Sequence, residues 1–147
     1  TKGCLIMDSQ NNKSIIQFTN PELVESIFME NPNYKGSLDI SQNMMISTNH
    51  SDIQIESKFN KSSIVSLTVS NFNQINMNSN KPFFIRQTMK AKFIWKKGLS
   101  TEEEEDLLKV NAASLLLSYI RPQIRSITSL SKFREQNIPF IDFTSQL

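Results

Sequence analysis

Several residue types are scarce in this sequence of 147 residues, and each scarcity excludes a kind of site. Cysteine and histidine occur once each, as Cys4 and His50, so clusters of these two residues cannot bind a metal. A lone cysteine also cannot form an internal disulfide, which is typical of proteins in a reducing compartment. The three glycines are too few and too scattered for a loop that holds a phosphate group.

The sequence has neither a basic cluster nor a long apolar run. The net charge is +2, and the lysines and arginines are scattered, which argues against a nucleic-acid partner. No stretch approaches the roughly 18 apolar residues of a membrane span, and Leu5 to Met7 is too short for the core of a signal peptide. We therefore expect a single cytoplasmic domain over residues 1–147, without nucleic-acid binding or membrane insertion.

Residues that could form a catalytic centre are equally few. Cys4 and His50 lie in different irregular segments, so two unrelated residues are a better interpretation than a nucleophile and its base. The acidic run Glu102 to Asp106 is at the start of a predicted helix, where we expect a solvated turn that the helix dipole favours. The sequence therefore predicts no enzyme activity, no cofactor and no metal.

The clearest pattern is the alternation from Phe83 to Trp95. One set of alternate residues is almost entirely apolar, and the other set is mostly polar. This pattern is typical of an antiparallel strand that is covered on one side. The apolar set comprises Phe83, Ile85, Gln87, Met89, Ala91, Phe93 and Trp95.

Shorter patterns predict further strands before this one. In residues 52–59, alternation places Ile53, Ile55 and Phe59 on one face, and Asn60 and Lys61 are expected to turn the chain into the next strand. Residues 73–82 are predicted to form a polar loop. The remaining strands are expected over residues 14–18, 23–30, 44–48 and 64–72. Strands followed by a helix indicate the α+β class, with a twisted antiparallel sheet of about four strands and a helix on one face.

A long helix is predicted from Ser100 onward. Ser100 can act as its N-cap, with Glu103 completing a capping box. The segment Leu107 to Ile120 is apolar on more than one face, whereas a helix on a sheet surface needs one apolar face. We interpret the additional apolar faces as contacts with another subunit.

Proline at position 122 falls inside this helix and removes a backbone donor. It predicts a kink near Tyr119 or a break into two helices, 102–120 and 122–131. The chain after Phe133 is expected to run extended over the body of the domain.

The helix and the residues after it resemble the SecB protein-export chaperones. The stretch Leu117 to Ile127, the pair Lys132 and Phe133, and the run from Asn137 to Phe143 contain the resemblance. The family pattern has an aromatic–arginine pair, an apolar residue three positions on, a small–Phe turn, and a proline-containing extended segment that ends Asn-Phe. The matching residues are Tyr119, Arg121, Ile124, Phe133 and Phe143, and the departures are Pro122, Ser131 and Asp142.

This resemblance implies an ATP-independent holdase that binds unfolded preproteins before translocation. It implies apolar grooves between sheet and helix, dimers formed through sheet edges, tetramers formed through the long helix, and the SecA motor as a partner. We expect the second long helix and tail of the family to be missing. By position, the resemblance assigns Trp95, Tyr119, Phe133, Phe140 and Phe143 to the peptide groove. It assigns subunit or client contact to Phe83, Ile85, Gln87, Met89, Leu116, Ile120 and Ile124.

Two alternatives remain open. The first is a SecB-like chaperone dedicated to one client, such as an antitoxin, because the weak positive charge contrasts with the acidic surface by which the family engages SecA. The second is an oligomeric interaction module whose apolar faces are all used in self-assembly, which predicts no exposed groove. Ten phenylalanines and six methionines suit an adaptable binding surface, although a place in the core is the more common role of any one of them.

Overall fold

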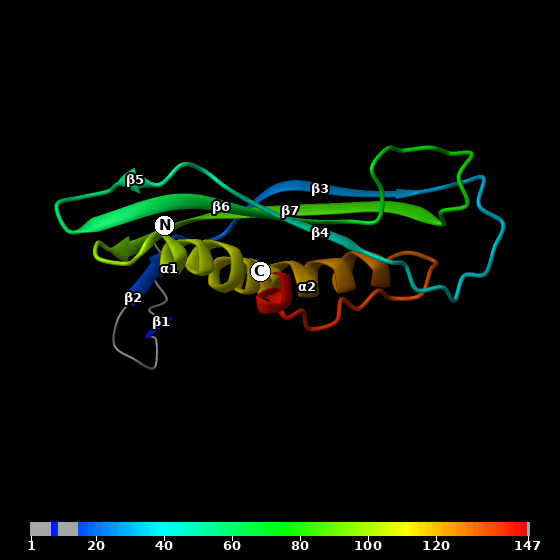
Figure 1. The fold of residues 1–147 in the computed structure, drawn as a ribbon. Coiled ribbons are helices and arrows are strands. Elements are labelled where there is room, and N and C mark those ends of the chain that lie inside the picture. Colours follow the sequence, from blue (N-terminus) through cyan, green and yellow to red (C-terminus); the bar gives the residue numbers. More distant parts are fainter. Residues whose placement is uncertain (1–6, 9–14, 147) are drawn as a thin grey trace.

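The computed structural model describes residues 7–8 and 15–146, in which one antiparallel sheet lies against one long helix (Figure 1). The long helix consists of α1 (Thr101–Asp106), the π-helical segment η1 (Leu107–Ala112) and α2 (Ala113–Ser129), and a short 3-10 helix, η2 (Phe143–Gln146), follows. The α+β class is as predicted. The strands are β1 (Met7–Asp8), β2 (Ile15–Phe18), β3 (Glu22–Glu30), β4 (Met45–His50), β5 (Gln54–Ile55), β6 (Asn60–Ser70) and β7 (Phe83–Lys96).

Strand β7 is the centre of the sheet. It pairs with β6 along one side, and with β3 and then β2 in series along the other side. Strands β4 and β5 lie in series along the outer side of β6 in the same way. The described chain therefore forms seven strands, and the predicted count of about four is wrong. The count is higher because β3 and β2 share one side of β7, and β4 and β5 share the outer side of β6.

The predicted strand over 52–59 is largely a turn. The N–H groups of Glu56 and Ser57 both donate to the carbonyl of Asn60, at 2.9 and 3.2 Å, so β6 begins where a turn was expected. The hairpin extends past the start of the helix (Figure 1). Ile55 and Phe59 are accordingly 74% and 69% exposed. Alternation in this segment does not mark a buried face.

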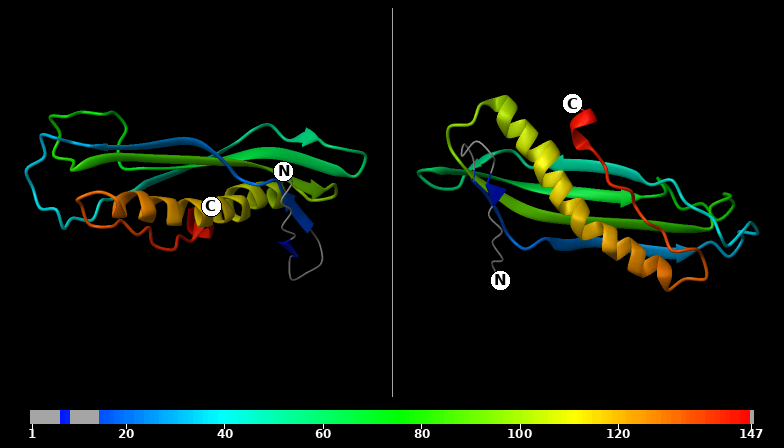
Figure 2. Two further views of the ribbon diagram at one scale, coloured as in Figure 1. Left: turned by 180° about the vertical axis from the view of Figure 1, so that it is seen from behind. Right: turned by 90° about the horizontal axis from the view of Figure 1, so that it is seen from below.

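The helix-facing side of β7 forms the floor of the core. All seven residues of its predicted apolar face are at most 4% exposed. The opposite side of the sheet has no helix over it (Figure 2) and is mainly polar, with ion pairs such as Lys92–Glu56 at 2.7 Å. The strand therefore has one apolar face under the helix and one mainly polar face without a helix, as its alternation predicts.

The long helix is covered on two sides by its own chain. The sheet covers one side, and the C-terminal segment, residues 130–142, returns beside the helix (Figure 2) and adds Phe133 and Ile138 to the core. Leu116, Ile120 and Ile124 are completely buried as a result. A second subunit is therefore not needed to cover these three residues, because the C-terminal segment supplies the second apolar layer. As expected, this segment runs extended after Phe133.

The start of the helix is as predicted, and the predicted alternative of a break at Pro122 is wrong. The N–H of Glu103 donates to Ser100 Oγ at 3.1 Å, and Gly98, at φ 115°, turns the chain between β7 and this cap. Helix α2 continues through Pro122 without a break. Proline at this position leaves the carbonyl of Ser118 without its helical donor, and Pro122 and Ser118 both lie on the exposed side of the helix, where water can replace that donor. No described helix is long and apolar enough to cross a membrane.

The acidic first turn is only partly solvated. Glu104 is 6% exposed, and its carboxylate accepts a hydrogen bond from Trp95 Nε1 at 2.8 Å. Lys61 Nζ lies 3.2 Å from the same carboxylate. The expectation of a fully solvated turn is wrong for Glu104 because the buried indole N–H needs an acceptor.

Candidate functional site

A groove runs along the β4 edge of the sheet. One wall is β4 with the residues just before it, and the other wall is the extended part of the C-terminal segment. The groove has a volume of about 360 Å³. None of the described residues that line it is charged: Gln42, Asn43, Met44, Ile46, Gln136, Asn137, Ile138, Pro139 and Ile141.

Gln136 holds the two walls together. Its side-chain oxygen accepts a hydrogen bond from the backbone N–H of Gln42 at 2.9 Å, and its Nε2 donates to the carbonyl of Ile40 at 2.9 Å. The backbone N–H of Gln136 donates to Thr128 Oγ1 at 2.9 Å. One buried residue thus connects the helix, the C-terminal segment and the crossover segment, residues 31–44, which links β3 to β4.

Further contacts fasten the C-terminal segment to the helix. Arg121 Nε donates to the carbonyl of Ile138 at 3.0 Å, and Arg125 forms an ion pair with Glu135 at 2.6 Å. Beyond the groove, the carboxylate of Asp142 accepts hydrogen bonds from the hydroxyl and backbone N–H of Thr144, and these bonds lower the pKa of Asp142. The wall of the groove is therefore built by specific polar contacts.

The outer side of β4 is an open strand edge. Within the described chain, β4 pairs only with β6, so alternate backbone groups of β4 point away from the sheet. Met45 and Phe140 lie near this edge, at 45% and 84% exposure. An extended peptide can add hydrogen bonds to such an edge while its side chains enter an adjacent apolar groove.

The aromatic residues predicted for a peptide groove do not lie together. Trp95, Phe133 and Phe143 are at most 5% exposed and belong to the core, so they cannot line a surface groove. Tyr119 is 40% exposed on the helix but does not line the groove along β4. Phe140 is the one at the rim, between Pro139 and Ile141, which both line the groove. Burial makes the other aromatics anchors of the fold.

The residues predicted for subunit or client contact are likewise internal. Phe83, Ile85, Gln87, Leu116, Ile120 and Ile124 are completely buried, and Met89 is 4% exposed. In this structure they have no surface to offer a partner, because helix and sheet bury them against each other.

The residues that do line the groove were not singled out in the sequence. Met44 and Ile46 lie in or beside the strand expected over 44–48, and Ile141 lies in the extended segment, so a local pattern marks each wall. What brings the walls together is the pairing of residues 40–42 with Gln136, which are more than 90 positions apart. No local sequence pattern predicts that contact.

Replacing Gln136 with methionine is expected to loosen the groove. The change removes the hydrogen bonds to Gln42 and Ile40 while keeping the volume, and should lower the free energy of unfolding by about 1–3 kcal/mol. Urea denaturation measures the loss, and hydrogen exchange at the Gln42 amide should accelerate. Gln17, which is exposed on β2, provides the matched control: Gln17→Met should change stability by less than about 0.5 kcal/mol. Equal stability of both variants would show that Gln136 does not hold the walls.

Comparisons with known proteins concern the fold. No family model and no curated protein matches the sequence. A protein of unknown function from Streptococcus agalactiae has a similar structure, with a TM-score of 0.50 and 13% identity, over 85% of this chain and 97% of that one. A SecB-like chaperone from Mycobacterium tuberculosis, solved with an antitoxin peptide, aligns with a TM-score of 0.49 and 9% identity, over 86% and 88% of the two chains. At these identities the function has to be argued from the surface of this chain.

Proposed function

We propose that this protein is an ATP-independent holdase that binds unfolded polypeptides in the groove along β4. The observation that carries the proposal is an open strand edge beside an uncharged groove, which apolar and amide side chains line together. An unfolded chain exposes apolar side chains and unpaired backbone groups, and this surface can satisfy both. The resemblance of residues 117–143 to the SecB chaperones supports the same function.

The mechanism needs no reaction and no nucleotide. A client segment lies along β4, where its backbone pairs with the strand edge and its alternate side chains enter the groove. Because the lining has no charge, the groove selects apolar, extended segments and not a particular sequence. Folded proteins, whose apolar side chains and backbone groups are already satisfied, are not bound. Clients are protected from aggregation as long as they occupy the groove.

The proposed setting is that of a SecB-like protein in the cytoplasm. We propose unfolded preproteins as clients, self-association into dimers or dimers of dimers, and the SecA motor as the receiver of clients. The alternative is an interaction module whose apolar surfaces are all used in self-assembly, in which a second copy of the chain would cover this groove.

Aggregation of a chemically unfolded client tests the proposal. Equimolar protein, without nucleotide, should suppress the light scattering that follows dilution of the client from denaturant, and the native client should not bind. Binding should show a negative heat-capacity change because apolar surface is buried. Protection of one client alone would point to a dedicated chaperone. If an excess of the protein slows the aggregation of no client, the holdase proposal is wrong.

A further inference from the structure

A second hollow lies at the opposite edge of the sheet, between β3 and the helix. Its volume is about 340 Å³, near the lower end of the range for ligand pockets, so it suits one side chain and not a large ligand. Its described lining contains no ionisable group: Leu23, Ser26, Gln87, Pro122, Gln123, Ser126 and Ile127. We call this hollow the β3–α2 pocket.

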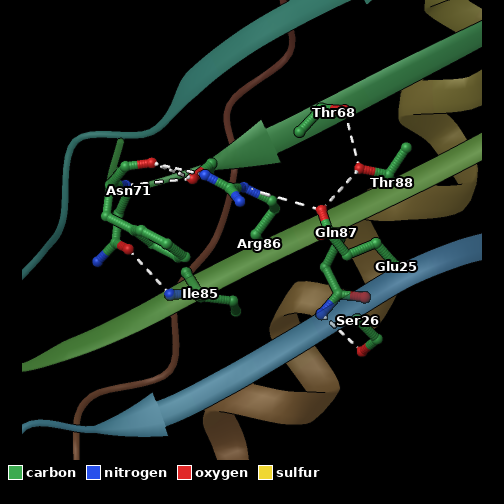
Figure 3. A network of polar contacts seen from close by, with 10 residues as sticks. Glu25, Ser26, Thr68, Asn71, Ile85, Arg86, Gln87 and Thr88 are labelled. Atoms are coloured by element: carbon green, nitrogen blue, oxygen red, sulfur yellow. Dashed lines mark hydrogen bonds and ion pairs between the residues drawn. The ribbon is translucent and has the colours of Figure 1, made fainter. Parts of the chain in front are cut away.

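Two buried amides at this pocket lack a hydrogen-bond partner for one atom each. Gln87 is completely buried, and its Nε2 donates to Ser26 Oγ at 2.9 Å (Figure 3). In the described structure, its Oε1 has no partner. The Oε1 of Gln123 is also buried without a partner, while its Nε2 contacts Met89 Sδ, a weak acceptor, at 2.8 Å. Both glutamines line the same small hollow, and each has one buried carbonyl oxygen without a donor.

Packing alone does not explain these amides. Gln87 lies between Ile85 and Met89 on the apolar face of β7, where an aliphatic side chain would fill the same space without an unsatisfied group. Buried polar atoms in native proteins are nearly always hydrogen-bonded, and leaving one unpaired is unfavourable. A ligand that donates hydrogen bonds into the pocket would remove this penalty.

We propose that the β3–α2 pocket binds the side-chain amide of a glutamine or asparagine in an extended client polypeptide. The inference rests on the proposed holdase function and adds a second contact at the other sheet edge. A primary amide has two N–H donors for the two carbonyl oxygens, and Leu23 and Ile127 can pack against the methylene groups. An amide also carries an acceptor, so it is complementary to Gln87 in either orientation of that side chain.

The pocket and the strand beside it also select against other ligands. A charged side chain would lose its hydration without gaining a counter-charge, and an aliphatic one would leave both carbonyl oxygens unsatisfied. Strand β3 has no partner on its outer side within the described residues, and Leu23 and Val24 are each 54% exposed there. The backbone of the client can therefore pair with β3 while one side chain enters the pocket.

Host–guest peptides test this selectivity. A short, dye-labelled, unstructured peptide with glutamine, asparagine, leucine or glutamate at one central position is titrated with the protein, and fluorescence anisotropy gives each affinity. We expect the glutamine and asparagine peptides to bind about tenfold more tightly than the leucine and glutamate peptides, a difference of about one hydrogen-bonded polar group. The side-chain NH₂ resonances of Gln87 and Gln123 should shift when the glutamine peptide binds.

The double variant Gln87→Met and Gln123→Met removes both amides at similar volume. It should lose the preference for glutamine over leucine without a fall in melting temperature, because two unsatisfied buried groups are removed. The control Gln17→Met, at an exposed glutamine, should keep the preference.

Three results would overturn the inference while leaving the holdase proposal intact. The first is equal affinity of the parent for all four guest peptides, and the second is an unchanged preference in the double variant. The third is a double variant in which only the oligomeric mass changes, which would mean that a second copy of the chain occupies the pocket. If the parent binds neither these peptides nor any unfolded client, the proposed function and this inference both fail.

Discussion

Replacing Leu116 with glutamate is expected to unfold the subunit and not merely to separate subunits. Leu116 is completely buried in helix α2, within the core that sheet, helix and C-terminal segment share. A carboxylate at this position would have no counter-charge and no water. The loss of the leucine contacts costs about 2–5 kcal/mol, and an unpaired charge costs several kcal/mol more. Their sum is comparable with the about 5–15 kcal/mol of total stability typical of a domain.

Circular dichroism and thermal melting measure this effect. The variant should lack the cooperative transition of the parent, and Leu116→Ala should retain it at a stability lower by about 2–5 kcal/mol. Leu130→Glu is the matched control, because Leu130 is 88% exposed just after the helix and the change there should cost less than about 0.5 kcal/mol. A Leu116→Glu protein that melts like the parent but has a smaller mass in light scattering would show that this face packs between subunits.

The central strand and the helix start could be predicted because their signals are local. Phe83 to Trp95 alternates over a whole strand, and the structure buries the predicted face. Ser100 and Glu103 are three residues apart, and the backbone N–H of Glu103 reaches the Ser100 hydroxyl as a capping box requires. The cap depends on two residues close in sequence, and the burial of the strand depends on one continuous apolar face, so both can be recognised in a short stretch of sequence.

The errors arise where a distant segment decides the environment of a residue. An apolar helix face indicates that something covers it, but not whether the cover is another subunit or the chain's own residues 130–142. In the same way, Ile55 and Phe59 alternate like buried residues, yet they lie in a hairpin beyond the start of the helix. Burial depends on which layer lies opposite, and that information is absent from the local pattern.

The candidate sites depend on single polar residues whose roles also require the fold. Gln136 is one of several amides in a polar stretch, and only the approach of the crossover segment makes it a connector. Gln87 has a visible signal, since it is the one polar member of the apolar face of β7. Its unpaired oxygen, in contrast, follows from how α2 and β3 leave a hollow above it.

Placing lysines in the groove along β4 is expected to abolish most client binding while the fold survives. Met44 and Ile141 line the groove and are partly exposed, so lysine can keep its methylene groups packed and extend its ammonium group into the open groove. Two charges would then occupy the space that apolar client side chains need. The double variant Met44→Lys and Ile141→Lys should weaken binding of an unfolded client by about 5- to 30-fold, from the loss of roughly 1–2 kcal/mol of apolar burial.

The matched control places the same charges on another exposed apolar surface. Ile55→Lys and Phe59→Lys remove two large apolar side chains from the hairpin before β6 and also add two positive charges. Aggregation suppression and calorimetric affinity are measured for parent, groove variant and hairpin variant at low and high salt, with melting temperature as the test of folding. The hairpin variant should protect clients as the parent does.

If the hairpin variant loses binding and the groove variant does not, clients bind the exposed hairpin. If both variants retain full affinity, the client site lies outside both surfaces. Loss in the groove variant alone, at both salt concentrations and with the melting transition intact, locates binding in the apolar groove, because a purely electrostatic effect of the new charges would be screened by salt.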